Sequence, residues 1–151
     1  MSKPVDRKGP LSAEELDQFF DEVNVPLRIA GVGATGHPIM ASLWYIRIED
    51  MLWCATQRAS TIASILSRDV RCSFEVSVEK PPYVGVRGPA LATLHPDRGE
   101  EILCALIDRY IGNRSSSFSR NLLSRAASET AIAIQPQALF TWDFRERMDG
   151  I

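Results

Sequence analysis

The chain has 151 residues, the length of one domain, and a chain of this size can bury a hydrophobic core without disulfides or a structural metal. It is 45% hydrophobic and 24% charged, as globular proteins usually are, and its net charge of -2 argues against a general nucleic-acid binder, which needs a basic face. No apolar run reaches the length of a membrane span, and the polar N-terminus is unlike a signal peptide. We therefore expect a cytoplasmic protein that binds neither nucleic acid nor membranes.

Residues 1–10 are expected to be disordered, because they combine charges, glycine and proline with little to bury. Ser12 and Glu15 have the spacing of a capping box, which predicts a helix that runs to about Val23. No linker interrupts the rest of the chain, so residues 11–151 are expected to form a single domain.

Most of the chain has the pattern of β-strands, which are apolar runs bounded by turn residues. The predicted strands cover residues 27–32, 39–48, 51–56, 71–78, 83–94, 130–134 and 139–144. Two further helices are predicted, one over 97–111 and one that begins at the serines of 115–117. Many strands, few helices and no regular alternation of the two argue for an antiparallel barrel with helices at its periphery.

The segment 51–76 is the most informative part of the sequence. A strand ends at Thr56, a polar turn follows, and Ser60 is the N-cap of a short helix that runs to about Arg68 with its apolar residues on one face. The free N–H groups and the dipole at the start of a helix favour an anion, so this hydroxyl-rich turn is a candidate anion site.

The order of these elements, with the corner Arg68-Asp69-Val70-Arg71 after the helix, resembles the flavin-binding split-barrel superfamily. Pyridoxamine 5′-phosphate oxidases and deazaflavin-dependent reductases belong to it. The resemblance covers about residues 26–148 and implies a mainly β (α+β) fold, a six-stranded antiparallel split β-barrel with peripheral helices. It also implies a homodimer with cofactor sites at the interface.

The resemblance further implies a set of cofactor contacts. The ring of the cofactor lies along residues 41–44, the next strand contacts the ribityl chain or ring edge, the turn before the short helix holds the phosphate, and Arg87 lies in the same groove or bridges the dimer. The candidate cofactor-binding residues are Ser42, Leu43, Trp44, Ala55, Thr56, Arg58, Ser60, Thr61 and Arg87.

Two cofactors remain open, FMN and a deazaflavin coenzyme of the F-420 type. The family usually has a lysine at the position of Ile62, often beside a second cation at the position of Thr61, and Arg58 is then the cation that is left to meet a phosphate. The ending Trp142-Asp143-Phe144 resembles the deazaflavin branch. FMN is the commoner cofactor of the family.

Other kinds of catalytic site have no support in the sequence. The chain has no nucleophile elbow and no glycine-rich phosphate loop. Cys54, Cys72 and Cys104 have neither disulfide nor zinc spacing, and the isolated His37 and His95 make a poor metal site, so no metal is expected. Catalytic residues are not identified.

Three functions are compatible with these observations. The first is an FMN- or deazaflavin-dependent oxidoreductase that transfers hydride to or from a small organic substrate, with the cofactor carrying the chemistry. The second is a non-catalytic split-barrel protein that binds or sequesters a flavin, a tetrapyrrole or a lipid-like ligand. The third is a scaffold that only dimerises or binds a protein partner.

Overall fold

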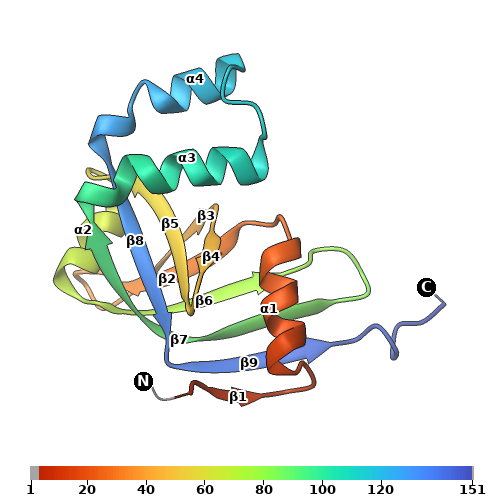
Figure 1. Ribbon diagram of the computed structural model, residues 1–151. Coiled ribbons are helices and arrows are strands. Elements are labelled where there is room, and N and C mark those ends of the chain that lie inside the picture. Colours follow the sequence, from red (N-terminus) through yellow and green to blue (C-terminus); the bar gives the residue numbers. More distant parts are fainter. Residues whose placement is uncertain (1–3, 151) are drawn as a thin grey trace.

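Residues 4–150 are described in the structure, a computed structural model, and they form a strongly curled β-sheet with helices around it (Figure 1). The strands are β1 (Asp6–Lys8), β2 (Leu27–Val32), β3 (Pro38–Leu43), β4 (Ile46–Ile48), β5 (Met51–Gln57), β6 (Arg71–Ser77), β7 (Val84–His95), β8 (Glu129–Pro136) and β9 (Ala138–Asp143). The helices are α1 (Ala13–Glu22), α2 (Thr61–Arg68), α3 (Gly99–Tyr110) and α4 (Ser117–Leu123), with short 3-10 turns η1 (Pro96–Arg98) and η2 (Ala126–Ser128).

Within the described residues the sheet has nine strands, and seven of them follow in the order β3-β2-β6-β7-β8-β5-β4 with antiparallel pairing throughout. The long β7 pairs with β9 over residues 84–87 and with β8 over residues 90–95. β1 adds to β9 as a parallel pair. The mainly β, α+β split barrel with peripheral helices is confirmed, but the expected count of six strands is wrong, since the sheet of the described residues has nine. The short β1 was not predicted, and the predicted strand 39–48 forms two strands, β3 and β4.

The predicted strand 39–48 is divided in two at Trp44 and Tyr45. β3 lies at one end of the strand order and β4 lies at the other. Trp44 and Tyr45 therefore connect the two edge strands of the curled sheet, and we call the place where these edges face each other the seam. Tyr45 is fully buried, and its hydroxyl donates a hydrogen bond to the Phe20 carbonyl oxygen at 2.6 Å. Its backbone N–H meets the Tyr110 hydroxyl at 3.3 Å, so it takes no part in a strand pairing.

The expectation of a disordered segment over residues 1–10 is wrong for β1, and residues 1–3 lie outside the described part. Asp6, Arg7 and Lys8 pair in parallel with residues 138–140 of β9. The chain is then fastened to the sheet by Leu11, which is buried and donates its backbone N–H to Thr141 Oγ1 at 3.2 Å. The free edge of β9 supplies the hydrogen-bond partners that the local sequence did not indicate.

Alternation along β5 separates two apolar layers. Leu52 and Cys54 face the main core inside the curled sheet, while Trp53 and Ala55 face the opposite side, where α3 packs. α2 contributes Ile62 to the inner core. α3 therefore covers the outer face of β5 and β8, with α4 beyond it (Figure 1).

The end of α1 is held by one arginine of α3. The Arg109 guanidinium donates hydrogen bonds to the carbonyl oxygens of Phe20 at 2.8 Å, Asp21 at 3.0 Å and Val23 at 2.9 Å. The last carbonyls of a helix lack partners within it, and a cation also complements the helix dipole there. Arg109 thus joins α1 to the α3 side of the molecule.

Both predicted N-caps are confirmed. Ser12 and Glu15 form the reciprocal capping box of α1, with hydrogen bonds of 3.1 and 3.0 Å. Ser60 Oγ accepts the Ala63 N–H at 3.2 Å and starts α2. Among the helices of residues 4–150, none combines the length and apolar character needed to span a membrane.

Candidate functional site

A groove of about 250 Å³ lies between strands β3 and β5 and the helices α3 and α4. Four of the predicted cofactor residues, Ser42, Leu43, Trp44 and Ala55, line it together. The structure brings them to one place because Trp44 follows β3 at the seam, and Ala55 lies on the face of β5 that is turned toward α3. The remaining lining residues are Leu103, Leu106, Phe118, Leu122 and Glu129.

Aromatic rings form one wall of the groove. The Trp44 indole is stacked on the Tyr110 ring with centroids 5.0 Å apart and an angle of 6° between the planes, and Phe118 meets it edge-on at 6.3 Å. The Tyr110 hydroxyl donates to the Val25 carbonyl oxygen at 2.9 Å, which fixes the stack. Phe118 is 53% exposed, so the wall continues to the surface. Trp44 and Phe118, with their aliphatic neighbours, give the groove a partly aromatic lining that suits a planar conjugated ligand.

Glu129, which is not among the residues predicted from the sequence, also lines the groove. This residue opens β8 and is only 7% exposed. Its Oε1 accepts a hydrogen bond from Gln57 Nε2 at 2.8 Å, while its Oε2 is buried without a partner in the described residues. Burial raises the pKa of this carboxyl. No motif marks the position, since its partner Gln57 is 72 residues away in the chain.

The turn before α2 follows directly from β5. Arg58 and Thr61 are exposed there, and the Arg58 backbone N–H donates to the Ser128 carbonyl oxygen at 2.9 Å. Ser60 uses its hydroxyl as the helix cap. Ile62 is only 4% exposed and packs in the main core, so its side chain does not face this turn and a lysine ammonium in its place would be buried.

Thr56 and Arg87 lie outside the groove. Thr56 follows Ala55 on β5 and pairs with Thr130 of β8. Arg87 is exposed on β7, with its guanidinium 5.1 Å from the Trp142 ring and 4.0 Å from the Glu75 carboxylate. The structure thus separates Arg87 from the four groove residues and places it on a shallow surface that β3 and β9 also line.

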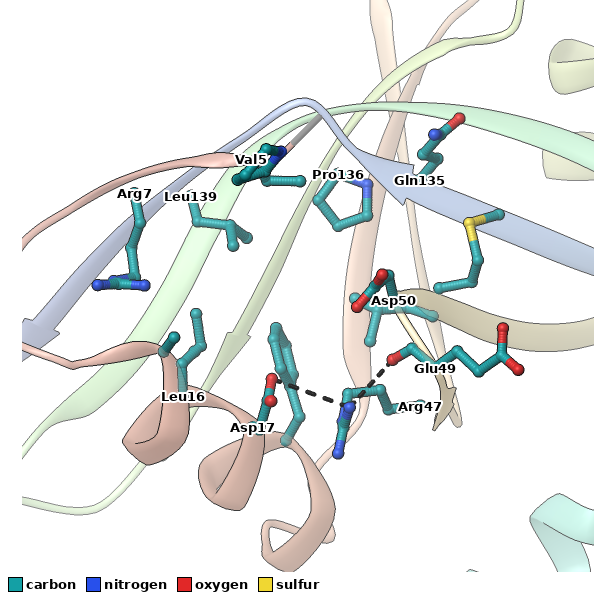
Figure 2. Close-up of a pocket in the computed structure, with 15 residues that line it drawn as sticks. Val5, Arg7, Leu16, Asp17, Arg47, Glu49, Asp50, Gln135, Pro136 and Leu139 are labelled. Atoms are coloured by element: carbon teal, nitrogen blue, oxygen red, sulfur yellow. Dashed lines mark hydrogen bonds and ion pairs between the residues drawn. The ribbon is translucent and has the colours of Figure 1, made fainter. Parts of the chain in front are cut away.

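A second cavity, of about 350 Å³, lies between β1, α1 and the turn from β4 to β5 (Figure 2). Leu16, Pro136 and Leu139 form apolar walls, and Figure 2 shows Arg47 linked to Asp17 at 3.8 Å and to the Glu49 carbonyl oxygen at 3.0 Å. None of the predicted cofactor residues lines this cavity. It is a separate concavity, and its Arg47 is already paired within the protein.

No protein-family model and no curated protein matches the chain. Solved structures do match. A conserved hypothetical protein from Mycobacterium tuberculosis is similar with a TM-score of 0.77 and 22% identity, covering 91% of this chain and 88% of that one. An F420 reductase is similar with a TM-score of 0.66 and 19% identity, covering 81% and 94%.

The similarity extends to a protein of a different kind. The heme storage protein HutZ from Vibrio cholerae has a TM-score of 0.63 and 20% identity, covering 85% of this chain and 92% of its own. The predicted resemblance to split-barrel proteins is therefore confirmed at the level of the fold. At these identities the similarity concerns the fold alone, and function has to be argued from the groove.

Proposed function

We propose that the chain binds a flavin-type cofactor, FMN or a deazaflavin coenzyme, and uses it to exchange hydride with a small organic substrate. The observation that carries this proposal is the groove, in which Ser42, Leu43, Trp44 and Ala55 gather beside an aromatic wall. Its apolar, partly aromatic lining fits the conjugated ring of either cofactor. The fold is also similar to that of an F420 reductase, which supports the hypothesis of an oxidoreductase.

The residues of the chain bind and orient the cofactor in this proposal. The ring lies along β3 against Leu43 and Trp44, and Thr56 contacts the part of the cofactor that leaves the groove. Arg58, Ser60 and Thr61 hold its phosphate, or the acidic tail of a deazaflavin, through the N-terminus of α2. When bound, the ring supplies the hydride chemistry. The apolar walls exclude water from it.

Titration of the purified protein with FMN, and separately with the deazaflavin coenzyme, tests the proposal. Fluorescence quenching is expected to saturate at one site per chain for one of the two. Consumption of the reduced cofactor by an acceptor then distinguishes an enzyme from a binding protein. Saturation by neither cofactor, in protein whose circular dichroism shows a folded chain, would overturn the proposal.

Replacement of Arg58 by alanine is expected to weaken FMN binding by about tenfold, because one charge-assisted hydrogen bond to the phosphate is lost. Arg58 is exposed and has no ion-pair partner within residues 4–150, so its loss should leave the fold intact. Arg68, at the other end of α2, supplies the matched control. Arg68→Ala should bind FMN as the unaltered protein does, and equal affinities of all three proteins would exclude Arg58 from the site.

We further propose a homodimer in which the surface beside Arg87 is part of the interface. This surface has a shallow hollow of about 360 Å³. Two apolar residues that line it are exposed to solvent, Met40 of β3 with an exposed fraction of 69% and Phe140 of β9 with one of 40%. Apolar side chains exposed side by side in this way are typical of association surfaces. Arg87 would then bridge the two subunits.

Met40→Asp is expected to convert the dimer into monomers, because it places a charge in an apolar contact. Sedimentation velocity measures the change directly. Val70→Asp is the control, since Val70 is an exposed apolar residue at the corner between α2 and β6. A dimer that survives Met40→Asp would place the interface elsewhere, and a monomeric unaltered protein would rule out the dimer.

The alternative function is non-catalytic binding of a tetrapyrrole or another flat ligand. It is supported by the similarity in fold to HutZ, a heme storage protein, and by the buried Ile62 at the position where the family usually has a lysine. Hemin titration followed by the Soret absorbance separates the two proposals. Hemin binding together with no affinity for either flavin would favour this alternative.

A further inference from the structure

We infer that Glu129 is a ligand-binding residue of the groove, and that it donates a hydrogen bond from Oε2 to a carbonyl oxygen or ring nitrogen of the planar ligand. The inference rests on the proposed function, since it takes the groove to be the place where the ring binds. It adds to that function a residue that selects ligands by a hydrogen-bond acceptor on the ring.

The position of one carboxyl oxygen is fixed by a small network at the start of β8. Gln57 Nε2 donates to Glu129 Oε1 at 2.8 Å and to the Arg125 carbonyl oxygen at 3.3 Å. The Ser128 hydroxyl donates to Gln57 Oε1 at 2.6 Å. Both ends of the Gln57 amide are thus engaged, and its orientation is set. Glu129 Oε1 can act only as an acceptor in this arrangement.

The second oxygen lacks a partner. Glu129 Oε2 is buried, and within residues 4–150 no donor or acceptor reaches it. A buried polar atom left without a hydrogen bond costs about 1–3 kcal/mol, so such atoms in folded proteins call for an explanation. Glu129 lines a groove whose other walls are apolar except for Ser42. A polar atom of a ligand in this groove would supply the missing partner.

The protonation state decides what kind of ligand atom that is. Burial raises the pKa of the Glu129 carboxyl, and the charged group that opposes this effect is the Arg125 guanidinium. β5 contributes the uncharged Gln57 amide, and α3 and α4 contribute only apolar side chains to the groove. With Oε1 occupied as an acceptor, the proton of the neutral acid lies on Oε2. For the protonated carboxyl the complementary ligand atom is an acceptor, which both flavin and deazaflavin rings carry.

Two substitutions at this position separate a binding role from a structural one. Glu129→Gln keeps the acceptor for Gln57 and replaces the O–H donor by an N–H donor, whereas Glu129→Leu removes both. Glu100 lies exposed on α3 and provides the control Glu100→Gln. FMN is the probe, and affinity is measured by fluorescence quenching from about pH 5 to about pH 9, which brackets a raised carboxyl pKa.

We expect Glu129→Leu to weaken FMN binding by about tenfold and Glu129→Gln to retain it near neutral pH. The affinity of the unaltered protein relative to Glu129→Gln should fall as pH rises, because the ionised carboxylate loses its donor. The FMN phosphate titrates equally in both proteins, so this ratio reports Glu129 alone. Glu100→Gln should behave as the unaltered protein does at every pH.

Two results would overturn the inference. One is equal affinity in the unaltered protein, Glu129→Gln and Glu129→Leu when all three are folded. The other is an affinity ratio between the unaltered protein and Glu129→Gln that does not change with pH. Failure of the unaltered protein itself to bind FMN, the deazaflavin or hemin is a different outcome, which removes the groove as a ring site and the proposed function with it.

Discussion

Replacement of Arg109 by methionine is expected to lower the free energy of unfolding by about 3 kcal/mol. The guanidinium donates to three carbonyl oxygens at the end of α1, those of Phe20, Asp21 and Val23. Hydrogen bonds from a charged donor are stronger than neutral ones, and all three acceptors lose this donor together. The Tyr45 hydroxyl still donates to Phe20 at 2.6 Å and to Val23 at 3.3 Å. Methionine keeps an unbranched apolar stem in the same space, so the loss measures the hydrogen bonds more than the packing. Urea denaturation followed by circular dichroism gives the value.

Arg114→Met is the matched control. Arg114 follows α3, and its guanidinium pairs with the Asp108 carboxylate at 2.7 Å on the surface, where both side chains are about half exposed. Exposed ion pairs contribute at most about 1 kcal/mol. The two substitutions remove the same group a few residues apart, so similar losses of stability would show that Arg109 does not hold α1 in the way the hydrogen bonds indicate.

The features that the sequence predicted correctly depend on residues close together in the chain. The Ser12 and Glu15 capping box spans three residues, and the Ser60 cap depends only on the turn before α2. The alternation of apolar residues in β6 and the helical spacing in α3 are equally local signals. Local patterns of this kind predict the elements and their order, and the fold class follows from that order.

What the sequence missed depends on partners far apart in the chain. β1 exists because the edge of β9 is open some 130 residues later, and the break at Tyr45 depends on acceptors in α1. Glu129 was missed for the same reason. In the sequence it is a polar residue just before the predicted strand 130–134, as a loop residue would be. Its side chain is buried in the structure, where β8 pairs with β5.

Ile62 shows two sequence signals in conflict. Helical spacing groups Ile62 with Ile65 and Leu66 on one apolar face, whereas the family resemblance assigns the same position to a phosphate-binding lysine. The structure agrees with the spacing, since all three side chains are buried. The burial of the Ile62 side chain stabilises the core, and the chain lacks the lysine that the family motif has at this position. In the proposed cofactor site, the phosphate would therefore be held by the exposed residues of the turn, Arg58 above all.

Replacement of Ser42 by tryptophan is expected to weaken FMN binding by about 100-fold. Ser42 lies on β3 and lines the groove of about 250 Å³, so an indole at this position occupies space that the cofactor ring needs. Forcing a ligand into an overfilled site costs about 3 kcal/mol, which corresponds to that change in affinity. The side chain is exposed and tryptophan is favoured in strands, so the fold should be retained. Fluorescence anisotropy of FMN measures the affinity.

Two further variants make the result specific to the groove. Ser42→Ala removes only the hydroxyl and should change the affinity by no more than about tenfold, the value of one neutral hydrogen bond. Thr93→Trp places the same indole on an exposed position of β7 that does not line the groove, and it should bind as the unaltered protein does. If Ser42→Trp still binds FMN with the original affinity, the cofactor does not occupy this groove. The second cavity, beside α1 and Arg47, then becomes the next site to block in the same way.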